Sequence, residues 1–297
     1  MTATANPVGV ELRIASANLQ EGGVDKTTGS DIRWQKTIDA LTAWNPHIVL
    51  LQEMRSASPE HTLRRHLHRT ANALGMTAIL GPVSPEPGSA NYPAILVTKG
   101  LVILDDGPWP QPGAPPWCHA LVQVPYMLHP LRVYSVHLPA RSATSQLAWA
   151  EYLANRIAQL GELTIAGGDW NGFSCGDADQ LTPKDLARLP PHLIPPRMRL
   201  NDLGERLSNY DVHQVLDSVG LVDAAAYLPA DRREPGELTP TADCSVGRID
   251  RFYTTLTLAA AMRSYRQQST GGSDHHAILL TLDLAAAAAA VPSETLP

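Results

Sequence analysis

The chain has 297 residues, of which 44% are hydrophobic and 18% charged, and its net charge is -6. This size supports one large core or two modest ones, and no apolar run approaches the roughly 18 residues that a membrane span needs. The acidic balance disfavours a protein that grips long nucleic acid, and three scattered cysteines exclude a disulfide framework. With no secretory signal at the start, we expect a globular, cytoplasmic protein.

The first part of the chain alternates strands and helices. Apolar and polar residues alternate over 8–14, which predicts a half-buried strand with Asn18 at its exit. A helix is predicted from a cap at Ser30 or Asp31 to a stop before Pro46. The next predicted elements are a buried strand at 47–53, a helix at about 59–74 and a strand at 76–80.

The second part is richer in strands and in irregular connections. Proline and glycine crowd residues 81–93 and 105–117, which is typical of surface loops. Region 182–209 reads as an insertion or a substrate-side loop with short helical pieces. We take 1–283 as one domain. Helical propensity of the alanines and plain disorder would both explain the alanine-rich residues 284–297, and we favour a frayed or disordered tail. The remaining predicted elements are strands at 94–98, 101–104, 119–124, 131–138, 163–169, 246–255 and 273–282, and helices at 143–160 and near 212–219.

Polar and mostly ionisable residues stand where the predicted strands end. One such residue would mean little, because strand ends meet solvent, but the repetition indicates that the side chains converge at one rim of a sheet. The residues are Asn18, Glu53, His137, Asp169, Asn171, Asp250, Asp274 and His275.

The stretch AGGDWNG at 166–172 shows this pattern most clearly. Side chains alternate along an extended chain, so Asp169 and Asn171 point the same way and could share one target. Carboxylate and amide oxygens suit magnesium or manganese, whereas histidines without cysteine or HExxH spacing argue against zinc. A hard metal, an imidazole and an acid together meet the needs of phosphoester hydrolysis.

Five motifs, LLQE, VHL, GDWN, RIDR and SDHH, in that order, resemble those of the endonuclease/exonuclease/phosphatase superfamily, the DNase-like metal phosphoesterases. The resemblance spans about residues 10–282. It implies an α/β fold, a four-layer sandwich in which two packed mixed β-sheets are flanked by helices. It also implies a phosphoesterase that depends on a divalent metal, Mg2+ or Mn2+.

The resemblance assigns a role to each motif residue. Glu53 is expected to be the principal metal ligand, supported by Asn18 and Asp274. Asp169 is expected to position or deprotonate the attacking water, and Asn171 to contact the phosphate oxygens.

The remaining roles concern imidazoles and cations. His275 is expected to lie against the phosphate, held by Asp250, with His137 as the second imidazole. Arg55 resembles a phosphate-contacting arginine, although a solvated loop cation is an equally good interpretation. His119 stands where many members carry an arginine, and we expect it to bind substrate.

Two features leave alternatives open. The acid that orients the first histidine in some nucleases is replaced by SANYP at 89–93, and Glu86 lies several residues too early, so the partner of His137 is open. Trp109 and Trp117 could either stack on a base or sugar ring or pin their loop.

The substrate is also open. Phosphodiester hydrolysis stands slightly ahead of phosphomonoester hydrolysis of a small metabolite or lipid headgroup. The expected substrate is a phosphorylated small molecule or a short nucleic acid, with no obligate protein partner. A catalytically quiet binding protein that retains the fold is the alternative of another class.

Overall fold

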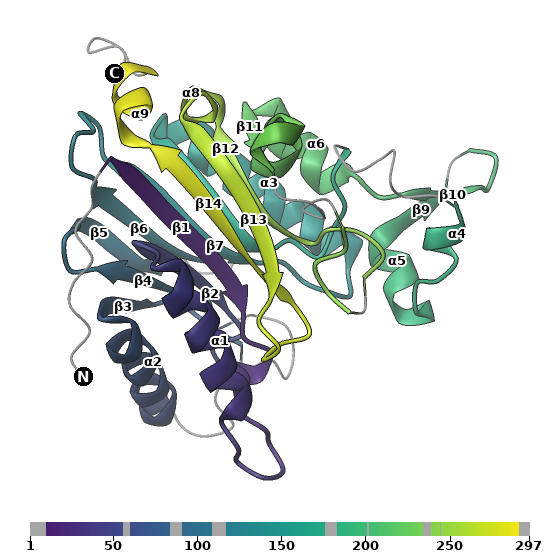
Figure 1. Ribbon diagram of the computed structural model, residues 1–297. Coiled ribbons are helices and arrows are strands. Elements are labelled where there is room, and N and C mark those ends of the chain that lie inside the picture. Colours follow the sequence, from purple (N-terminus) through teal and green to yellow (C-terminus); the bar gives the residue numbers. More distant parts are fainter. Residues whose placement is uncertain are drawn as a thin grey trace.

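Two six-stranded β-sheets pack face to face in the computed structural model (Figure 1). The residues it describes are 10–55, 60–83, 91–108, 117–175, 183–200, 202–233, 239–243 and 245–290. The first sheet has the order β13-β14-β1-β2-β4-β3 and the second the order β11-β12-β8-β7-β6-β5. Both are mixed, because β1 runs parallel to β2, β7 runs parallel to β8, and the other neighbours are antiparallel.

The strands have the following bounds. The first sheet contains β1 (Glu11–Asn18), β2 (Ile48–Gln52), β3 (Met76–Leu80), β4 (Ala94–Thr98), β13 (Met262–Ser269) and β14 (His276–Asp283). The second contains β5 (Val102–Pro108), β6 (Cys118–Gln123), β7 (Leu131–His137), β8 (Leu163–Asp169), β11 (Leu221–Asp223) and β12 (Asp250–Thr255).

Helices cover the outer faces of both sheets. Residues of α1 (Ile32–Trp44) and α2 (Glu60–Leu74) share a buried apolar cluster with the outer face of the first sheet. Those of α3 (Ala143–Leu160) and α6 (Asp211–Ser218) do the same on the second. The largest apolar cluster fills the space between the sheets. The four-layer α/β sandwich expected from the sequence is therefore confirmed.

The chain ends its helices with the signals that the sequence carries. Ser142 caps α3 by accepting a hydrogen bond from the backbone N–H of Ser145, and Gly161 closes it in a left-handed conformation. At α1, Asn45 adopts a left-handed conformation immediately before Pro46. These ends deliver the chain into the next strands with little intervening loop.

The insertion segment, residues 182–209, projects beside the end of the sandwich (Figure 1). Its described elements are α4 (Pro183–Leu186), a 3-10 turn at Pro191–Leu193, α5 (Ile194–Arg197), β9 (Met198–Leu200) and β10 (Arg206–Ser208). Its apolar residues share a small cluster with Phe173, Ala242 and Ile249. The insertion is thus anchored to loops that carry strand-end residues.

The chain after β14 corrects the expected frayed tail. Leu284–Ala290 form helix α9, and Leu284 and Ala287 are buried in the core between the sheets. Helical propensity combined with this apolar contact therefore outweighs fraying. Residues 291–297 lie outside the described part of the chain.

Strand β13 is absent from the elements expected from the sequence. Its segment, MRSYRQQS, buries Met262 and Tyr265 and leaves most other positions partly or fully exposed. A strand at the edge of a sheet has a neighbouring strand along one edge only and buries few of its side chains. Its sequence therefore lacks the usual alternation of apolar and polar residues. Four-residue helices α7 (Ala224–Tyr227) and α8 (Leu256–Ala259) were too short to produce a periodic signal.

The structure decides between the two alternatives that the sequence leaves open for Trp117. Its side chain is 1% exposed and packs under α3, with its ring 5.8 Å from that of Tyr152. It therefore belongs to the core and is not available to stack on a base or sugar ring. Trp109 lies outside the described residues.

Candidate active site

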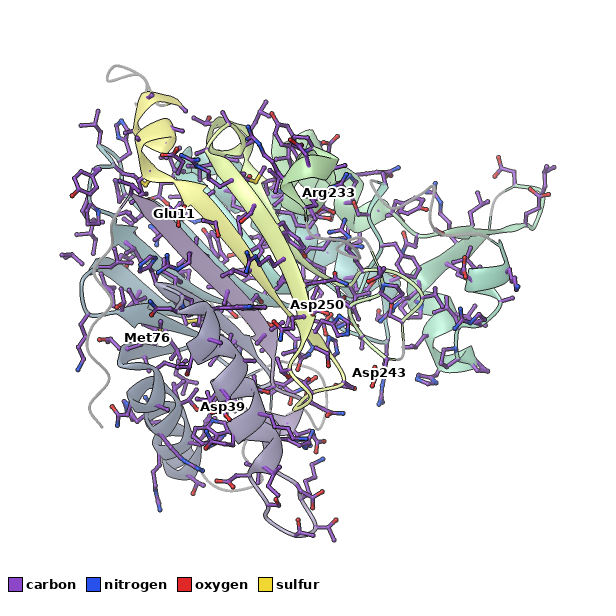
Figure 2. All side chains as sticks on the ribbon, in the orientation of Figure 1. Glu11, Asp39, Met76, Arg233, Asp243 and Asp250 are labelled. Atoms are coloured by element: carbon purple, nitrogen blue, oxygen red, sulfur yellow. The ribbon has the colours of Figure 1, made fainter. Side chains whose placement is uncertain are left out.

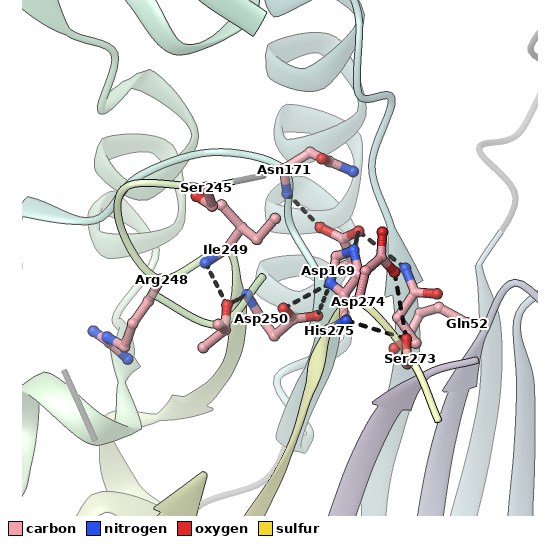
Figure 3. Close-up of polar contacts among 12 residues, drawn as sticks. Gln52, Asp169, Asn171, Ser245, Arg248, Ile249, Asp250, Ser273, Asp274 and His275 are labelled. Carbon is pink, nitrogen blue, oxygen red and sulfur yellow. Dashed lines mark hydrogen bonds and ion pairs between the residues drawn. The ribbon is translucent and has the colours of Figure 1, made fainter. Parts of the chain in front are cut away.

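Strand register brings the predicted residues to one edge of the sandwich. His137 ends β7 directly opposite Asp169 on β8, and Asp250 begins β12 opposite Asp169 on the other side. In the first sheet, Asn18 ends β1 opposite Gln52 on β2. Figure 3 shows the carboxylates of Asp169, Asp250 and Asp274 gathered around His275, while all side chains are shown on the whole molecule in Figure 2.

Asp169 lies at the centre of the site. Its Oδ2 accepts a hydrogen bond from Asn18 Nδ2 at 3.2 Å and lies 3.6 Å from Nε2 of His137 and 3.7 Å from Nε2 of His275. Its Oδ1 accepts the backbone N–H of Asn171 at 3.0 Å. The two imidazole distances exceed a hydrogen bond, so both Nε2 atoms face Asp169 without being bonded to it.

The two glycines before Asp169 have separate packing reasons. A Cβ at Gly167 would lie 2.5 Å from the ring of Phe252, within the core between the sheets. One at Gly168, where φ is +150°, would lie 1.9 Å from the carbonyl oxygen of Val136. Close approach of the neighbouring strands therefore requires glycine at both positions.

His275 forms a buried pair with Asp250. Its Nδ1 lies 2.9 and 3.1 Å from the two carboxylate oxygens of Asp250. Burial alone would lower the pKa of His275, but the negative charges of Asp250 and Asp169 raise that pKa well above its usual value. We therefore assign the proton on Nδ1 to the bond with Asp250 and describe the ring as cationic near neutral pH.

Glu53 enters the site through a left-handed backbone conformation. Strand alternation would place it on the outer face with Val49 and Leu51, which belong to the helix-side cluster. Its φ of +54° breaks that alternation just after β2, at a cost of about 1–2 kcal/mol for a non-glycine residue. The turn at 20–23 compensates in part, because the backbone N–H of Glu21 donates to Oε2 of Glu53 at 3.0 Å.

Asn18 is a hydrogen-bond donor in this arrangement. Its Nδ2 donates to Glu53 at 3.3 Å as well as to Asp169, and its Oδ1 accepts the backbone N–H of Gln20 at 2.9 Å. In this orientation the nitrogen of Asn18 supports the two carboxylates. Its oxygen has a second lone pair, so a contribution to a metal site stays a prediction.

The carboxylates nevertheless fit a divalent cation. Burial and the negative charges of Glu53 and Asp169 raise the pKa of Asp274, with His275 opposing them. A carboxylate crowded in this way by other acids is stabilised by a cation, and oxygen donors suit Mg2+ or Mn2+. Glu53 and Asp274 are the residues that would hold it.

A second set of donors lies deeper. Asp169, Asp250 and His275 offer ligand atoms within 4.8 Å of one another, and all three are buried. In this structure the Nδ1 atom of His275 is committed to Asp250. We therefore interpret this set as a hydrogen-bonded acid and imidazole centre rather than as the first choice for a metal.

His137 obtains its carboxylate neighbours from the site itself. Its Nε2 lies 3.6 Å from Asp169 and 4.0 Å from Oε1 of Glu53. Glu86, considered from the sequence as a distant alternative, lies outside the described residues. Among the residues described, the acids that face His137 are thus Asp169 and Glu53.

His119 is a correction, because it lies on the wrong face of the second sheet. Its neighbours in β6, Cys118 and Ala120, point into the core between the sheets, so His119 points to the outer face. There it is buried and lies 3.0 Å from Nη1 of Arg132. Burial and the Arg132 charge lower the pKa of His119, which favours a neutral structural histidine. A substrate-binding role is not supported.

Arg55 lies beside the site but in an ion pair. Its Nη1 donates to Oε1 of Glu21 at 2.8 Å, and each side chain is 28% exposed. Lys26 contacts the same carboxylate. Glu21 therefore already supplies an anion to Arg55, and a phosphate would have to share the guanidinium with it or replace it.

Replacing Glu21 by glutamine tests the role expected of Arg55. We expect the free energy of unfolding to change by less than about 1 kcal/mol, because partly exposed ion pairs contribute little. If Arg55 contacts the substrate, its release lowers KM for an anionic ester several-fold. An unchanged KM, measured beside Arg55→Met as the matched variant, assigns Arg55 to a structural pair.

Two supporting residues were not identified from the sequence. Gln52 joins the sheets beneath the site, because its Nε2 donates to Ser16 in β1 and to Ser135 in β7 at 3.2 and 3.1 Å. A glutamine inside an apolar strand, as in IVLLQ, is a signal that could have found it. Arg197 is buried in the insertion and donates to Oδ1 of Asn171 at 3.1 Å. No sequence pattern pointed to Arg197.

The fold and site together define a four-layer α/β sandwich protein with acids and imidazoles at one edge of its paired sheets. The chain belongs to the Endonuclease/Exonuclease/phosphatase family, whose model matches residues 15–275. No protein of curated function matches the sequence significantly. None of the helices in the described residues is long and apolar enough to cross a membrane.

Solved structures confirm the fold. An AP endonuclease from Archaeoglobus fulgidus matches with a TM-score of 0.60 at 16% identity, covering 92% of this chain and 99% of that one. A mannosyl-6-phosphatase from Bacteroides thetaiotaomicron matches with a TM-score of 0.58 at 14% identity, covering 91% and 98%. Truncated TDP2 from Caenorhabditis elegans matches with a TM-score of 0.54 at 16% identity, covering 92% and 98%.

Proposed function

We propose that the protein hydrolyses a phosphoester bond, most readily a phosphodiester, with the help of a divalent cation. The observation that carries the proposal is the placement of Asp169. Its carboxylate lies between the Nε2 atoms of His137 and His275, at 3.6 and 3.7 Å, while Asp250 holds the far side of the His275 ring. This places a base and two potential N–H donors around one point.

The residues of this centre have complementary tasks. Asp169, held by the backbone N–H of Asn171 and by Asn18, accepts a hydrogen bond or a proton from the attacking water. His275, cationic and fixed by Asp250, donates from Nε2 to a phosphoryl oxygen. His137 approaches the same oxygens from β7. A cation bound by Glu53 and Asp274 would neutralise charge on the phosphate and the leaving oxygen.

Charge favours a diester over a monoester. Four acids surround the site, namely Glu53, Asp169, Asp250 and Asp274. His119 does not lie in the site, and Arg55 is paired with Glu21. A diester carries one negative charge near neutral pH, whereas a monoester carries nearly two. The four acids therefore repel a monoester more strongly than they repel a diester.

Phosphomonoester hydrolysis is the second candidate. Its specific support is the similarity in fold to the mannosyl-6-phosphatase, together with a net charge of -6, which disfavours a long nucleic acid. A catalytically quiet binding protein is disfavoured because Glu53, Asp169 and His275 are all present at one edge. A cytoplasmic location and action without an obligate protein partner remain predictions from the sequence.

Removing divalent metal tests the proposal directly. Hydrolysis of bis(p-nitrophenyl) phosphate should fall on addition of EDTA and return when magnesium or manganese is restored, because Glu53 and Asp274 would hold a cation that neutralises charge on the ester. Release of p-nitrophenolate gives the rate. Turnover that persists after chelation and dialysis contradicts the role of the metal.

A substrate panel under one metal condition separates the two candidates. Supercoiled plasmid, single-stranded DNA and RNA represent diesters, and nucleotides, sugar phosphates and inositol phosphates represent small monoesters. We expect higher kcat/KM for diesters. Activity confined to small monoesters overturns the preference for a diester while leaving phosphoester hydrolysis in place.

A further inference from the structure

Arg197 is a buried cation bonded directly to a residue of the proposed site. It is the last residue of α5, its side chain is 1% exposed, and its ring neighbour is Phe173, 5.8 Å from the guanidinium carbon. Its Nη2 donates to Oδ1 of Asn171 at 3.1 Å, and its Nη1 donates to Oγ of Ser245 at 2.9 Å.

These two bonds connect the two loops that flank the catalytic centre. Asn171 follows β8 just after Asp169, and Ser245 lies in the loop that leads into Asp250 at the start of β12. Both are drawn in Figure 3 beside the Asp169 and His275 cluster. Ser245 in turn donates to the carbonyl of Gly247 at 2.7 Å, which fixes that loop from within.

Asn171 is held in a single amide orientation. A guanidinium only donates and a carbonyl only accepts, so Arg197 requires Oδ1 and the carbonyl of Leu138 requires Nδ2, which it binds at 2.9 Å. The backbone of Asn171 is left-handed, with φ of +49°, and Gln146 Nε2 binds its carbonyl at 3.0 Å. Both ends of the amide and the backbone carbonyl of Asn171 are therefore fixed by hydrogen bonds.

This orientation makes Asn171 a directed donor. An amide nitrogen carries two hydrogens, of which Leu138 takes one, so the second is available to an anion. A cation bonded to the amide oxygen also draws electron density from the nitrogen and strengthens the remaining N–H as a donor. The stronger hydrogen bond stabilises an oxygen most where negative charge develops on that oxygen during the reaction.

We propose that Arg197 is a positioning residue that aligns and polarises the Asn171 amide so that its free N–H binds a phosphoryl oxygen of the substrate. This inference rests on the proposed phosphoester hydrolysis. It assigns a task to the insertion segment, which supplies to the site a cation that does not itself touch the substrate. The insertion segment then has a structural role in the catalytic centre.

A double-mutant cycle on a diester tests the inference. Arg197→Met removes both bonds while keeping much of the volume, and we expect kcat to fall about 10- to 100-fold with a smaller change in KM, because alignment is lost. In an Asn171→Ala background the same change should alter kcat by less than about twofold, since the group through which Arg197 acts is gone. An equal loss in both backgrounds, or none in the native protein, overturns the proposal.

Two comparisons separate positioning from folding. Arg132→Met is the matched control, because Arg132 is also buried but bonds to Asp105 and Glu162 and not to a site residue. It should cost stability and leave kcat unchanged. If Arg197→Met does not fold, Arg197→Lys replaces it, because a lysine cannot reproduce the fork that serves Asn171 and Ser245 together. Native kcat in Arg197→Lys rejects the proposal.

An activity-independent measurement separates this inference from the proposed function. Binding of inorganic phosphate in the presence of magnesium, measured by calorimetry, should weaken about tenfold in Arg197→Met and in Asn171→Ala, and no further in the double variant. This result is expected even if no ester in the panel is cleaved. Equal phosphate affinity in the native protein and Arg197→Met overturns the inference, whatever the fate of the proposed function.

Discussion

Replacing His275 by alanine is expected to lower turnover of a diester by about 10²- to 10⁴-fold, the range typical of a lost general acid or base. The ring is buried, its Nδ1 is bonded to Asp250, and its Nε2 faces Asp169 at 3.7 Å. The change removes the imidazole that we propose as the donor to a phosphoryl oxygen, and it breaks the buried pair with Asp250. The measurement is kcat with bis(p-nitrophenyl) phosphate under saturating magnesium.

The adjacent histidine provides the control. His276 begins β14, is half-buried and takes no part in the proposed chemistry, so His276→Ala should keep turnover within a few-fold of native. Asp169→Asn should produce a loss similar to that of His275→Ala, because an amide nitrogen cannot accept a proton from the attacking water. Near-native rates in both Asp169→Asn and His275→Ala would reject the catalytic assignment.

Replacing Asp223 by asparagine is expected to lower the free energy of unfolding by about 3–5 kcal/mol, the cost of breaking a buried ion pair on one side. Asp223 ends β11, and its Oδ2 lies 2.7 Å from Nη2 of Arg248 and 3.4 Å from Nε of Arg251. Both arginines are fully buried, and Asp223 also caps α7 through the backbone N–H of Ala225. The variant leaves two buried cations without their shared anion. Urea unfolding gives the value.

Acid should weaken the same ion pairs by protonating Asp223. Burial alone would raise the pKa of Asp223, but Arg248 and Arg251 lower it to about 2. Because the folded pKa lies below the ordinary value of 3.8, the stabilisation is complete above that value and is lost as pH falls through about 2. The native protein should therefore lose stability between these two pH values through this group, and Asp223→Asn should lose less.

A surface pair supplies the control for this prediction. Asp211 pairs with Arg199 at 3.1 Å, with side chains 33% and 48% exposed, so Asp211→Asn should cost less than about 1 kcal/mol. An unchanged urea midpoint in Asp223→Asn would show that the buried cations are satisfied without it.

Local pattern identified most elements that carry the site. The helix at 143–160 and the strands that end at His137 and Asp169 agree with the structure, because a long amphipathic helix and buried strands with polar ends have strong periodic signals. Edge strand β13 and helix α9, which buries Leu284 and Ala287, were not predicted correctly. Both depend on packing against other elements, β13 by pairing with β14 and α9 by contact with the core between the sheets, which periodicity does not register.

The orientation of the site side chains was harder to predict from the sequence than the secondary-structure elements. Alternation gave Asp169 and Asn171 a common direction, whereas His119 was expected in the site only from the family resemblance, and the fold turns it to the outer face. Glu53 reaches the site only because its φ of +54° breaks alternation, and a backbone strain of that kind has no signature in the residues themselves. The turn that supports it is held by a hydrogen bond between residues 32 positions apart in the chain.

The sequence by itself determined the chemical inventory of this protein, most of its strands and helices, and the motifs that place it in its family, because these depend on residue type and local order; the two-sheet layout was expected only through the resemblance to that family. Only the tertiary structure decided which side chains meet: that Asn18 donates to carboxylates, that Arg55 is paired with Glu21, and that Arg197 supports Asn171. The reason is physical. A residue's identity sets what it can bond to, but its partner is chosen by strand register and packing over long separations in the chain.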